Sequence, residues 1–263
     1  MSVSVAGSGH RLDIGKVLTD GLGVLAHNFG PLFLLALLLQ GIPAALTAWG
    51  QVIGAGNPLG GMFAAVGGLA SLVTVPMLAG ALIYGCMRGL EGQPASIDDC
   101  LKVGVRHWLP MLGLMIGSSI LIGLGFILLI VPGALLALRW SVAAPILVLE
   151  GRGIAEAMGR SADLTRDRRG AIFLLFLIYF GIQCVLQSVL GAVGLGYKAA
   201  GMGLGLGFPF AAFGPRPAVI VLLTPIISVC TSLVLNAIVA TLFRELRGDK
   251  EGGHPETLGE VFA

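Results

Sequence analysis

Six long apolar stretches divide the chain, and shorter amphipathic stretches separate them. A helix needs roughly 20 apolar residues to cross a hydrocarbon core about 30 Å thick. The stretches that approach or exceed this length are 29–49, 62–87, 108–130, 132–149, 171–196 and 217–243. Their apolar runs are continuous, whereas the strands of a membrane β-barrel alternate apolar and polar residues. The pattern predicts an all-α fold, a polytopic membrane bundle of six transmembrane helices.

Composition supports a membrane protein. Hydrophobic residues make up 56% of the chain, charged residues only 11%, and mean hydropathy is +0.94, which is outside the range of soluble domains. The four cysteines are widely spaced and form neither a C-x-x-C pair nor a metal-ligand spacing with histidine. We interpret them as reduced packing residues, and we expect no metal and no cofactor.

The charged residues are distributed asymmetrically around the six stretches. With both termini in the cytoplasm, thirteen of the sixteen Lys and Arg residues lie on the cytoplasmic side, Lys198 and Arg216 lie outside, and Arg139 lies within the membrane. All fourteen Asp and Glu residues also lie on the cytoplasmic side. Positive charge in cytoplasmic loops is the usual orientation signal. The sequence therefore predicts a multi-pass protein of the bacterial inner (plasma) membrane with both termini cytoplasmic.

A short pattern recurs before each pair of spans. It reads "IGKVLTDG" from Ile14, "IDDCLKVG" from Ile97 and "IAEAMGRS" from Ile154, with apolar residues at i, i+3 and i+4 and a small residue at i+7. This spacing forms one stripe of a helix, which suits a helix lying in the headgroup plane. We predict three hairpins, each preceded by an interfacial amphipathic helix and each ending in a Glu-Gly pair. Chance similarity among short amphipathic segments is the alternative.

The same boundaries divide the chain into three parts. Residues 1–11 are predicted to be a disordered N-terminus, residues 12–247 the six-helix membrane domain, and residues 248–263 a cytoplasmic C-terminal tail. The tips of the hairpins are predicted on the outer face, at residues 50–61, 131–133 and 197–216.

One set of motifs extends over nearly the whole chain. The central third contains Pro132-Gly133, Arg139-Trp140, Pro145, Glu150 and the run "AMGRSADLTRDRRGAIF". Together with "DIGKVLTDGLGVLAHNFGPLFLL" near the start and "LFRELRGDKEG" near the end, these residues resemble the membrane domain that some bacterial glycerophosphodiester phosphodiesterases carry ahead of their catalytic domain. That domain also occurs alone in small inner-membrane proteins. The resemblance implies a six-helix membrane domain and no activity, and the chain has no room for the catalytic barrel, so we predict that the protein is not an enzyme.

Arg139 is the unusual residue of the fourth apolar stretch. Its position in the sequence predicts a charge near the middle of the bilayer, where insertion of an arginine costs about 2.5–3.5 kcal/mol. Three partners could offset that cost: backbone groups of neighbouring helices, Glu150 or Asp163 across a helix kinked at Pro145, or a lipid phosphate. A guanidinium suits phosphate because its planar donors bind two oxygens at once.

The third amphipathic segment is the most basic part of the chain. Anionic lipid attracts each basic residue near the surface by about 1 kcal/mol, although these charges could also serve only as orientation signals. The residues that we predict to bind lipid are Arg139, Glu150, Arg160, Arg166, Arg168 and Arg169.

Membrane lipid with anionic headgroups is the partner that the sequence supports. Nucleic acid is not expected, because the basic residues border the spans and do not form a separate domain. The first function hypothesis is a non-enzymatic module that binds anionic lipid and organises or recruits partner proteins, membrane proteins included. The alternative is a translocator of a small amphiphile or lipid. An intramembrane carboxylate, which an ion-coupled transporter would use, is absent from the six stretches.

Overall fold

The computed structural model of the protein describes residues 14–54, 57–166, 168–201 and 217–251, and the regular elements in these ranges are all helical. Six helical stretches in this part are long and apolar enough to cross a membrane: Phe29–Ile53, Pro58–Leu90, Ile97–Leu128, Val131–Leu149, Arg169–Leu186 and Leu223–Lys250. The predicted fold class is confirmed: the chain is a polytopic helical membrane protein.

In chain order the helices are α1 (Ile14–His27), α2 (Phe29–Ala36), the π-helical segment η1 (Leu37–Gly41), α3 (Ile42–Ile53), α4 (Pro58–Leu90), α5 (Ile97–Leu128), α6 (Ile130–Arg139), α7 (Ala143–Leu149), α8 (Ile154–Leu164), α9 (Arg169–Gly201) and α10 (Pro217–Glu251). The first span consists of α2, η1 and α3, and the fourth consists of α6 and α7. The predicted N-terminus at 1–11 lies outside the described residues. Helix α10 continues past the domain boundary predicted at residue 247, and the rest of the tail lies outside the described part.

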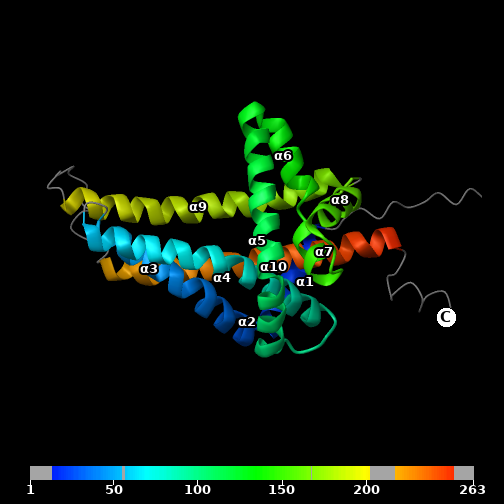
Figure 1. Cartoon of the computed structure of the whole chain (residues 1–263), viewed down its shortest axis with the longest axis horizontal. Helices are drawn as coiled ribbons and strands as arrows, with labels where there is room; N and C mark the ends of the chain where they lie inside the picture. The colour runs from blue at the N-terminus through cyan, green and yellow to red at the C-terminus, as the bar shows by residue number, and fades with distance from the viewer. Residues whose placement is uncertain (1–13, 55–56, 167, 202–216, 252–263) are drawn as a thin grey trace, which may run out of the picture.

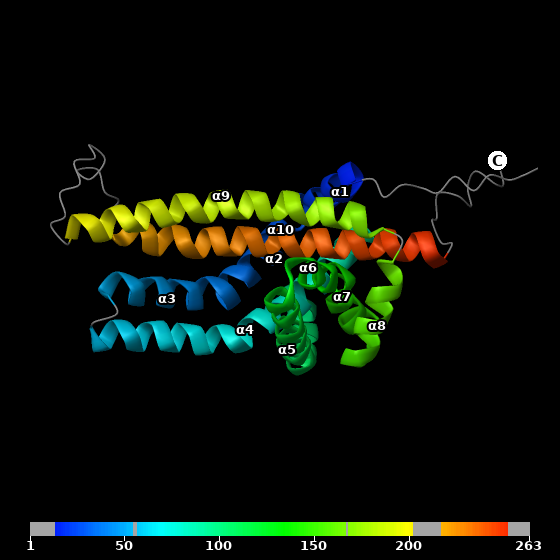
Figure 2. The same ribbon diagram turned by 90° about the horizontal axis from the view of Figure 1, so that it is seen from above.

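Two groups of helices cross each other. Helices α3, α4, α9 and α10 run along the long axis of the molecule in both views, whereas the α5–α6 hairpin runs across them (Figures 1 and 2). The sequence predicted that the tip of this middle hairpin, at 131–133, would lie on the same face as the other tips. In the structure the tip points away from the bundle to one side (Figure 1).

A close contact between glycine-containing helices explains the crossing. Gly104 of α5 lies directly on the backbone of α4, since a Cβ at this position would be 2.5 Å from the carbonyl oxygen of Met77. A Cβ at Gly80 of α4 would in turn lie 3.7 Å from the Cα of Gly104. Small residues let helix backbones approach this closely. Helix α5 therefore crosses close against α4 here, and a second close approach lies one turn away, where a Cβ at Gly85 of α4 would be 3.0 Å from Sγ of Cys100 on α5.

Substitution of Gly104 tests this contact. Gly104→Ala is expected to destabilise the protein by about 1–3 kcal/mol, because the added methyl group overlaps the α4 backbone. Gly117→Ala is the matched control, since a Cβ at Gly117 on the same helix meets no atom within 4 Å. Thermal unfolding of the detergent-solubilised variants provides the measurement. Equal unfolding temperatures for the two variants would show that the crossing does not depend on this contact.

The three copies of the amphipathic pattern are equivalent in the structure. Each is helical, and Ile14, Ile97 and Ile154 are the first residues of α1, α5 and α8. The residue at i+3 is buried in every copy, with exposed fractions of 1%, 1% and 0% for Val17, Cys100 and Ala157. The small residue at i+7 is buried as well in Gly21, Gly104 and Ser161. The shared pattern thus places the same face of each helix against the bundle.

The middle copy differs from the prediction in one respect. Helix α5 is continuous from Ile97 to Leu128, so its amphipathic start is not a separate interfacial helix. The first copy is separated from its span at Asn28, whose side chain accepts a hydrogen bond of 3.1 Å from the Ala95 amide. The corresponding stretch of α5, "HWLP", has neither an asparagine nor a glycine before its proline. The helix therefore continues through it, because leucine and tryptophan do not compete with the helical backbone as asparagine does.

The Glu-Gly pairs mark the C-terminal ends of helices. Gly92 and Gly151 directly follow the C-caps of α4 and α7, and their φ angles are +72° and +64°. This left-handed conformation is easily adopted only by glycine and commonly ends a helix. The glycine of the third pair, Gly252, lies outside the described residues.

Candidate functional site

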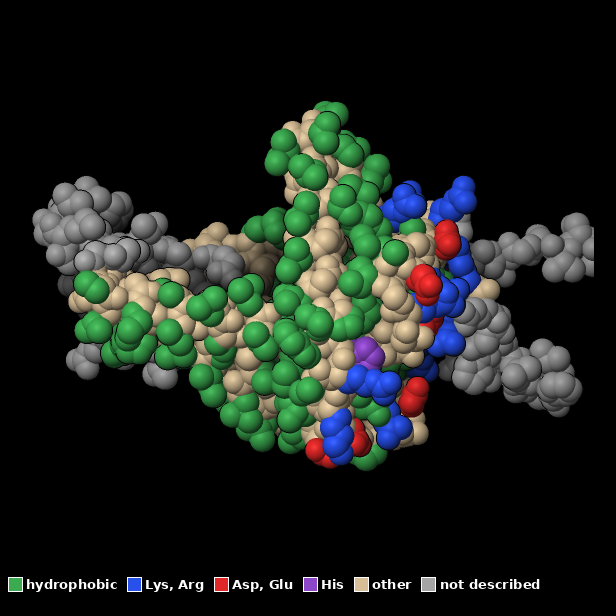
Figure 3. Space-filling model, in the orientation of Figure 1, with side chains coloured by type: hydrophobic (Ala, Val, Ile, Leu, Met, Phe, Trp, Pro, Cys, Tyr) green, Lys and Arg blue, Asp and Glu red, His purple; other side chains and the backbone are tan. Residues whose placement is uncertain are grey.

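Charged side chains gather at one end of the molecule. Figure 3 shows Lys, Arg, Asp and Glu side chains over α8 and the start of α5, while most of the remaining visible surface is apolar or backbone. Large apolar side chains are exposed elsewhere, for example Ile127 and Leu128 at the tip of the α5–α6 hairpin, with 82% and 76% of their surface accessible. An apolar flank with one charged end is typical of a bundle whose flank contacts lipid tails and whose end lies at the headgroups.

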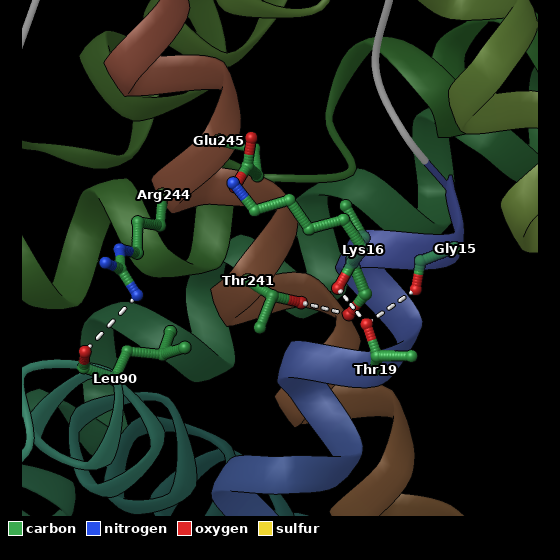
Figure 4. A network of polar contacts seen from close by, with 8 residues as sticks. Gly15, Lys16, Thr19, Leu90, Thr241, Arg244 and Glu245 are labelled. Carbon is green, nitrogen blue, oxygen red and sulfur yellow. Dashed lines mark hydrogen bonds and ion pairs between the residues drawn. The ribbon is translucent and has the colours of Figure 1, made fainter. Parts of the chain in front are cut away.

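Helix α1 is anchored to α10 at this end. The Thr241 hydroxyl donates a hydrogen bond of 3.3 Å to the carbonyl of Val17 on α1, and the Lys16 ammonium lies 3.6 Å from the Glu245 carboxylate (Figure 4). Gly21 lies beside this contact, where a Cβ would be in ordinary van der Waals contact, 3.5 Å from the Thr241 hydroxyl. The first amphipathic helix is thereby fixed beside the last span.

Helix α8 is anchored to the interruption of the fourth span. The Ser161 hydroxyl donates to the Arg139 carbonyl at 2.9 Å and accepts from the Val142 amide at 3.3 Å. The Thr165 hydroxyl also reaches the Arg139 carbonyl, at 3.4 Å. The span is interrupted at residues 140–142 because Pro145, which has no amide hydrogen, fits only the first turn of a new helix. Ser161 and Thr165 therefore satisfy backbone groups that the interruption leaves unpaired.

Arg139 lies at the charged end and not in the middle of a continuous span. It is the last residue of α6, and it is exposed. Its backbone carbonyl accepts a hydrogen bond from Ser161 of α8. Of the three partners considered from the sequence, no backbone group of the described residues bonds its guanidinium, and Glu150 pairs with Arg152 and Arg160. Within the described residues, the Arg139 guanidinium makes no hydrogen bond or ion pair. It is therefore available to a ligand.

Glu150 is the partner of two neighbouring arginines. Its carboxylate lies 2.7 Å from Nε of Arg152 and 2.9 Å from Nε of Arg160, and its side chain is only 11% exposed. Glu150 thus holds the guanidinium groups of these two arginines in place, and its predicted part in lipid binding stays a prediction. Arg160 stays at the charged end of the molecule while it is paired with Glu150.

The segment between α8 and α9 is tied to the end of α10. The Arg168 guanidinium lies 3.1 Å from the Asp249 carboxylate, and the Lys250 ammonium donates to the carbonyl of Asp163. Arg166 is exposed. Nε of Arg169 is buried and has no hydrogen-bond partner in the described part of the chain. The six predicted residues thus lie on or beside α8, with Arg139, Arg166 and Arg169 lacking an acidic partner there.

Sequence reasoning missed the two side chains that assemble this site. Ser161 and Thr165 are completely buried and hold α8 against the end of α6. The signal was present as the small residue at i+7 of the repeated pattern, which Ser161 occupies. No partner for the Ser161 hydroxyl could be assigned from the sequence, because the fourth span was expected to be a helix kinked at Pro145 and not two separate helices.

Comparison with known proteins gives a family and two relatives. Residues 110–246 match the family described as Domain of unknown function (DUF7847). A UPF0259 membrane protein of Sodalis glossinidius is 33% identical over 100 residues, which cover 38% of this chain and 40% of that protein. A UPF0259 membrane protein of Pectobacterium carotovorum is 32% identical over 129 residues, which cover 48% and 52%. The chain therefore spans about half, or less, of the curated relatives it matches. No solved structure matches it significantly.

The matched region contains all six predicted lipid-binding residues and the interruption between α6 and α7. The names of the relatives describe membrane proteins of bacteria and assign no activity. These comparisons give no evidence for the membrane domain of glycerophosphodiester phosphodiesterases, so that resemblance stays a prediction.

Proposed function

Since the chain belongs to the DUF7847 family of domains of unknown function, we propose its function from its own geometry: a non-enzymatic protein of the inner membrane whose basic end binds anionic lipid headgroups. In this proposal both termini are cytoplasmic, and the charged end lies at the cytoplasmic surface, where it organises or recruits partner proteins. The family resemblance drawn from the sequence motifs agrees with such a role, because the lone domain carries no catalytic part.

The observation that carries the proposal is a set of unpaired guanidinium groups around α8. Glu150 and Asp249 neutralise their neighbours Arg152, Arg160 and Arg168, whereas Arg139, Arg166 and Arg169 have no acidic partner in the described residues. Charges that served only to orient the chain would not need to be planar donors. Guanidinium groups bind phosphate oxygens in pairs, and each basic residue near the surface contributes about 1 kcal/mol to attraction by anionic lipid.

The alternative function, translocation of a small amphiphile or lipid, requires a route for a polar headgroup through the bundle. Two cavities border α9, and both are lined almost entirely by apolar side chains. Such walls suit the retention of an acyl chain better than the passage of a headgroup.

Native mass spectrometry of the detergent-solubilised protein tests the proposal. Phosphatidylglycerol is expected to bind at least about tenfold more tightly than phosphatidylcholine with the same acyl chains, because only the former has a net charge for the arginines. Arg139→Lys keeps the charge but loses the paired donors, so its affinity for phosphatidylglycerol is expected to fall about fivefold, close to 1 kcal/mol. Equal affinities of the wild-type protein for the two lipids would refute the proposal.

A further inference from the structure

A large cavity lies where the crossing hairpin meets the long helices. It has a volume of about 580 Å³ and is bounded by α5, α6, α9 and α10. Figures 1 and 2 show that α5 and α6 run across the bundle, at a large angle to α9. A volume in this range, about 300–1,000 Å³, is typical of sites that enclose most of a small ligand.

The walls of the cavity require an apolar occupant. Four phenylalanines contribute to them, Phe126 from α5 and Phe173, Phe176 and Phe180 from α9. Water gains little in such a space because a buried water needs several polar partners. Filling the cavity with hydrocarbon instead restores the dispersion contacts that its walls otherwise lack.

One side of the cavity is polar and lies at the interruption of the fourth span. Ser141 lines the cavity there, and its buried hydroxyl has no hydrogen-bond partner in the described residues. Leu138, two residues before the start of the turn, lines the same side. Arg139 stands between these two residues in the chain, but it is not a lining residue, because the lining positions 134, 137, 138 and 141 form one stripe along α6 and the turn after it, and Arg139 lies off that stripe.

An arginine approaches the mouth from α9. Arg169 precedes the lining residue Phe173 by one helical turn, and residues spaced i and i+4 share one face of a helix. The buried Nε of Arg169 has no hydrogen-bond partner in the described residues. A phosphate at the mouth would provide an acceptor for this guanidinium group, while a chain attached to it would enter the apolar space.

We propose that this cavity, between the α5–α6 hairpin and α9, holds one acyl chain of the anionic phospholipid whose phosphate binds Arg169. The Ser141 hydroxyl then donates to an ester carbonyl of that lipid, at the boundary between headgroup and chain. This inference rests on the proposed function and adds to it a defined site for a single lipid, distinct from the lipid that surrounds the bundle. It also gives the crossing hairpin a function, since a hairpin packed along α9 would close the cavity.

A second cavity of the protein offers a matched control. It has a volume of about 420 Å³ and lies between α1, α9 and α10, with Leu22 and Ile182 among its lining residues. On α1, the helix that forms one of its walls, Lys16 is already paired with Glu245. It therefore has a similar apolar wall without the unpaired arginine of the first cavity.

The test fills each cavity with a larger side chain and measures the binding of two phosphatidylglycerols by native mass spectrometry, one with sixteen-carbon chains and one with six-carbon chains. Ala137→Trp, in the first cavity, is expected to weaken binding of the long-chain lipid about tenfold or more, since two buried methylenes already account for about that factor. Binding of the short-chain lipid is expected to change less than about threefold. Leu22→Trp, in the second cavity, is expected to leave both affinities unchanged.

Two outcomes would overturn the acyl-chain site while leaving the proposed function intact. The first is an Ala137→Trp protein that binds long-chain phosphatidylglycerol as the wild type does. The second needs no variant: wild-type protein whose affinity for phosphatidylglycerol does not depend on chain length. The proposed function fails in a different way, through equal binding of phosphatidylglycerol and phosphatidylcholine. If Ala137→Trp does not fold, Ala134→Phe fills the same cavity from the preceding turn of α6.

Discussion

Ser161→Leu is expected to lower the free energy of unfolding by about 3 kcal/mol or more, the largest stability effect predicted for a single substitution in this protein. Ser161 is 0% exposed, and its hydroxyl bonds both the carbonyl of Arg139 and the amide of Val142. Leaving buried backbone groups without partners costs about 1–3 kcal/mol. Forcing a leucine into the contact between α8 and α6 adds a typical overpacking cost of about 1–3 kcal/mol.

Two further variants separate these contributions. Ser161→Ala removes the hydrogen bonds without adding volume, so it is expected to cost about 1–3 kcal/mol. Gly159→Ala on the same helix is the control, because a Cβ at Gly159 meets no atom within 4 Å, and alanine is expected to leave stability unchanged or raise it by up to about 1 kcal/mol. Thermal unfolding in detergent measures all three. If Ser161→Leu unfolds at the wild-type temperature, α8 is not held at the interruption of the fourth span.

The combined substitution of Arg139, Arg166 and Arg169 by glutamine is expected to weaken phosphatidylglycerol binding about a hundredfold. Each basic residue contributes about 1 kcal/mol near an anionic surface, and about 3 kcal/mol corresponds to two orders of magnitude in the dissociation constant. These side chains have no acidic partner in the described residues, so their removal leaves no carboxylate uncompensated. Titration by native mass spectrometry at two salt concentrations provides the measurement, and the wild-type affinity is expected to fall more steeply with salt.

Two controls isolate the cause of that loss. Substitution of Arg88, Lys102 and Arg106 by glutamine removes the same charge from the end of α4 and the start of α5 and is expected to weaken binding less than about tenfold. Replacement of the three site arginines by lysine keeps the charge and removes the planar donors. An equal loss in the first control and in the glutamine variant would mean that net charge alone attracts the lipid and that α8 carries no site.

The sequence predicted the elements that depend on local pattern. Continuous apolar runs identified the six spans, and the spacing of Ile14, Ile97 and Ile154 identified three helices with the same buried face. Glycine after glutamate marked the ends of α4 and α7, where Gly92 and Gly151 adopt positive φ angles. Each of these features is encoded within a few residues, so periodicity and turn chemistry are sufficient to find it.

Features that depend on contacts between distant residues were not predictable in the same way. The crossing of α5 over α4 depends on the approach of Gly104 to Met77, and nothing in the local sequence around either residue specifies the other. The same holds for the pairing of Arg168 with Asp249. Arg139 was expected near mid-bilayer because the fourth apolar stretch was treated as a single helix. The structure instead interrupts this stretch at residues 140–142, directly after Arg139, and the depth of Arg139 in the bilayer stays a prediction.

The lipid that remains bound to the protein after purification tests the central claim most directly. The wild-type protein, the glutamine variant of Arg139, Arg166 and Arg169, and the variant of Arg88, Lys102 and Arg106 would be purified in the same detergent from bacterial membranes, and their lipids extracted and quantified by mass spectrometry. Binding at α8 predicts that anionic phospholipid is enriched over the bulk membrane in the wild type and in the second variant, and that this enrichment disappears in the first. Lipid of bulk-membrane composition on all three proteins would contradict the claim.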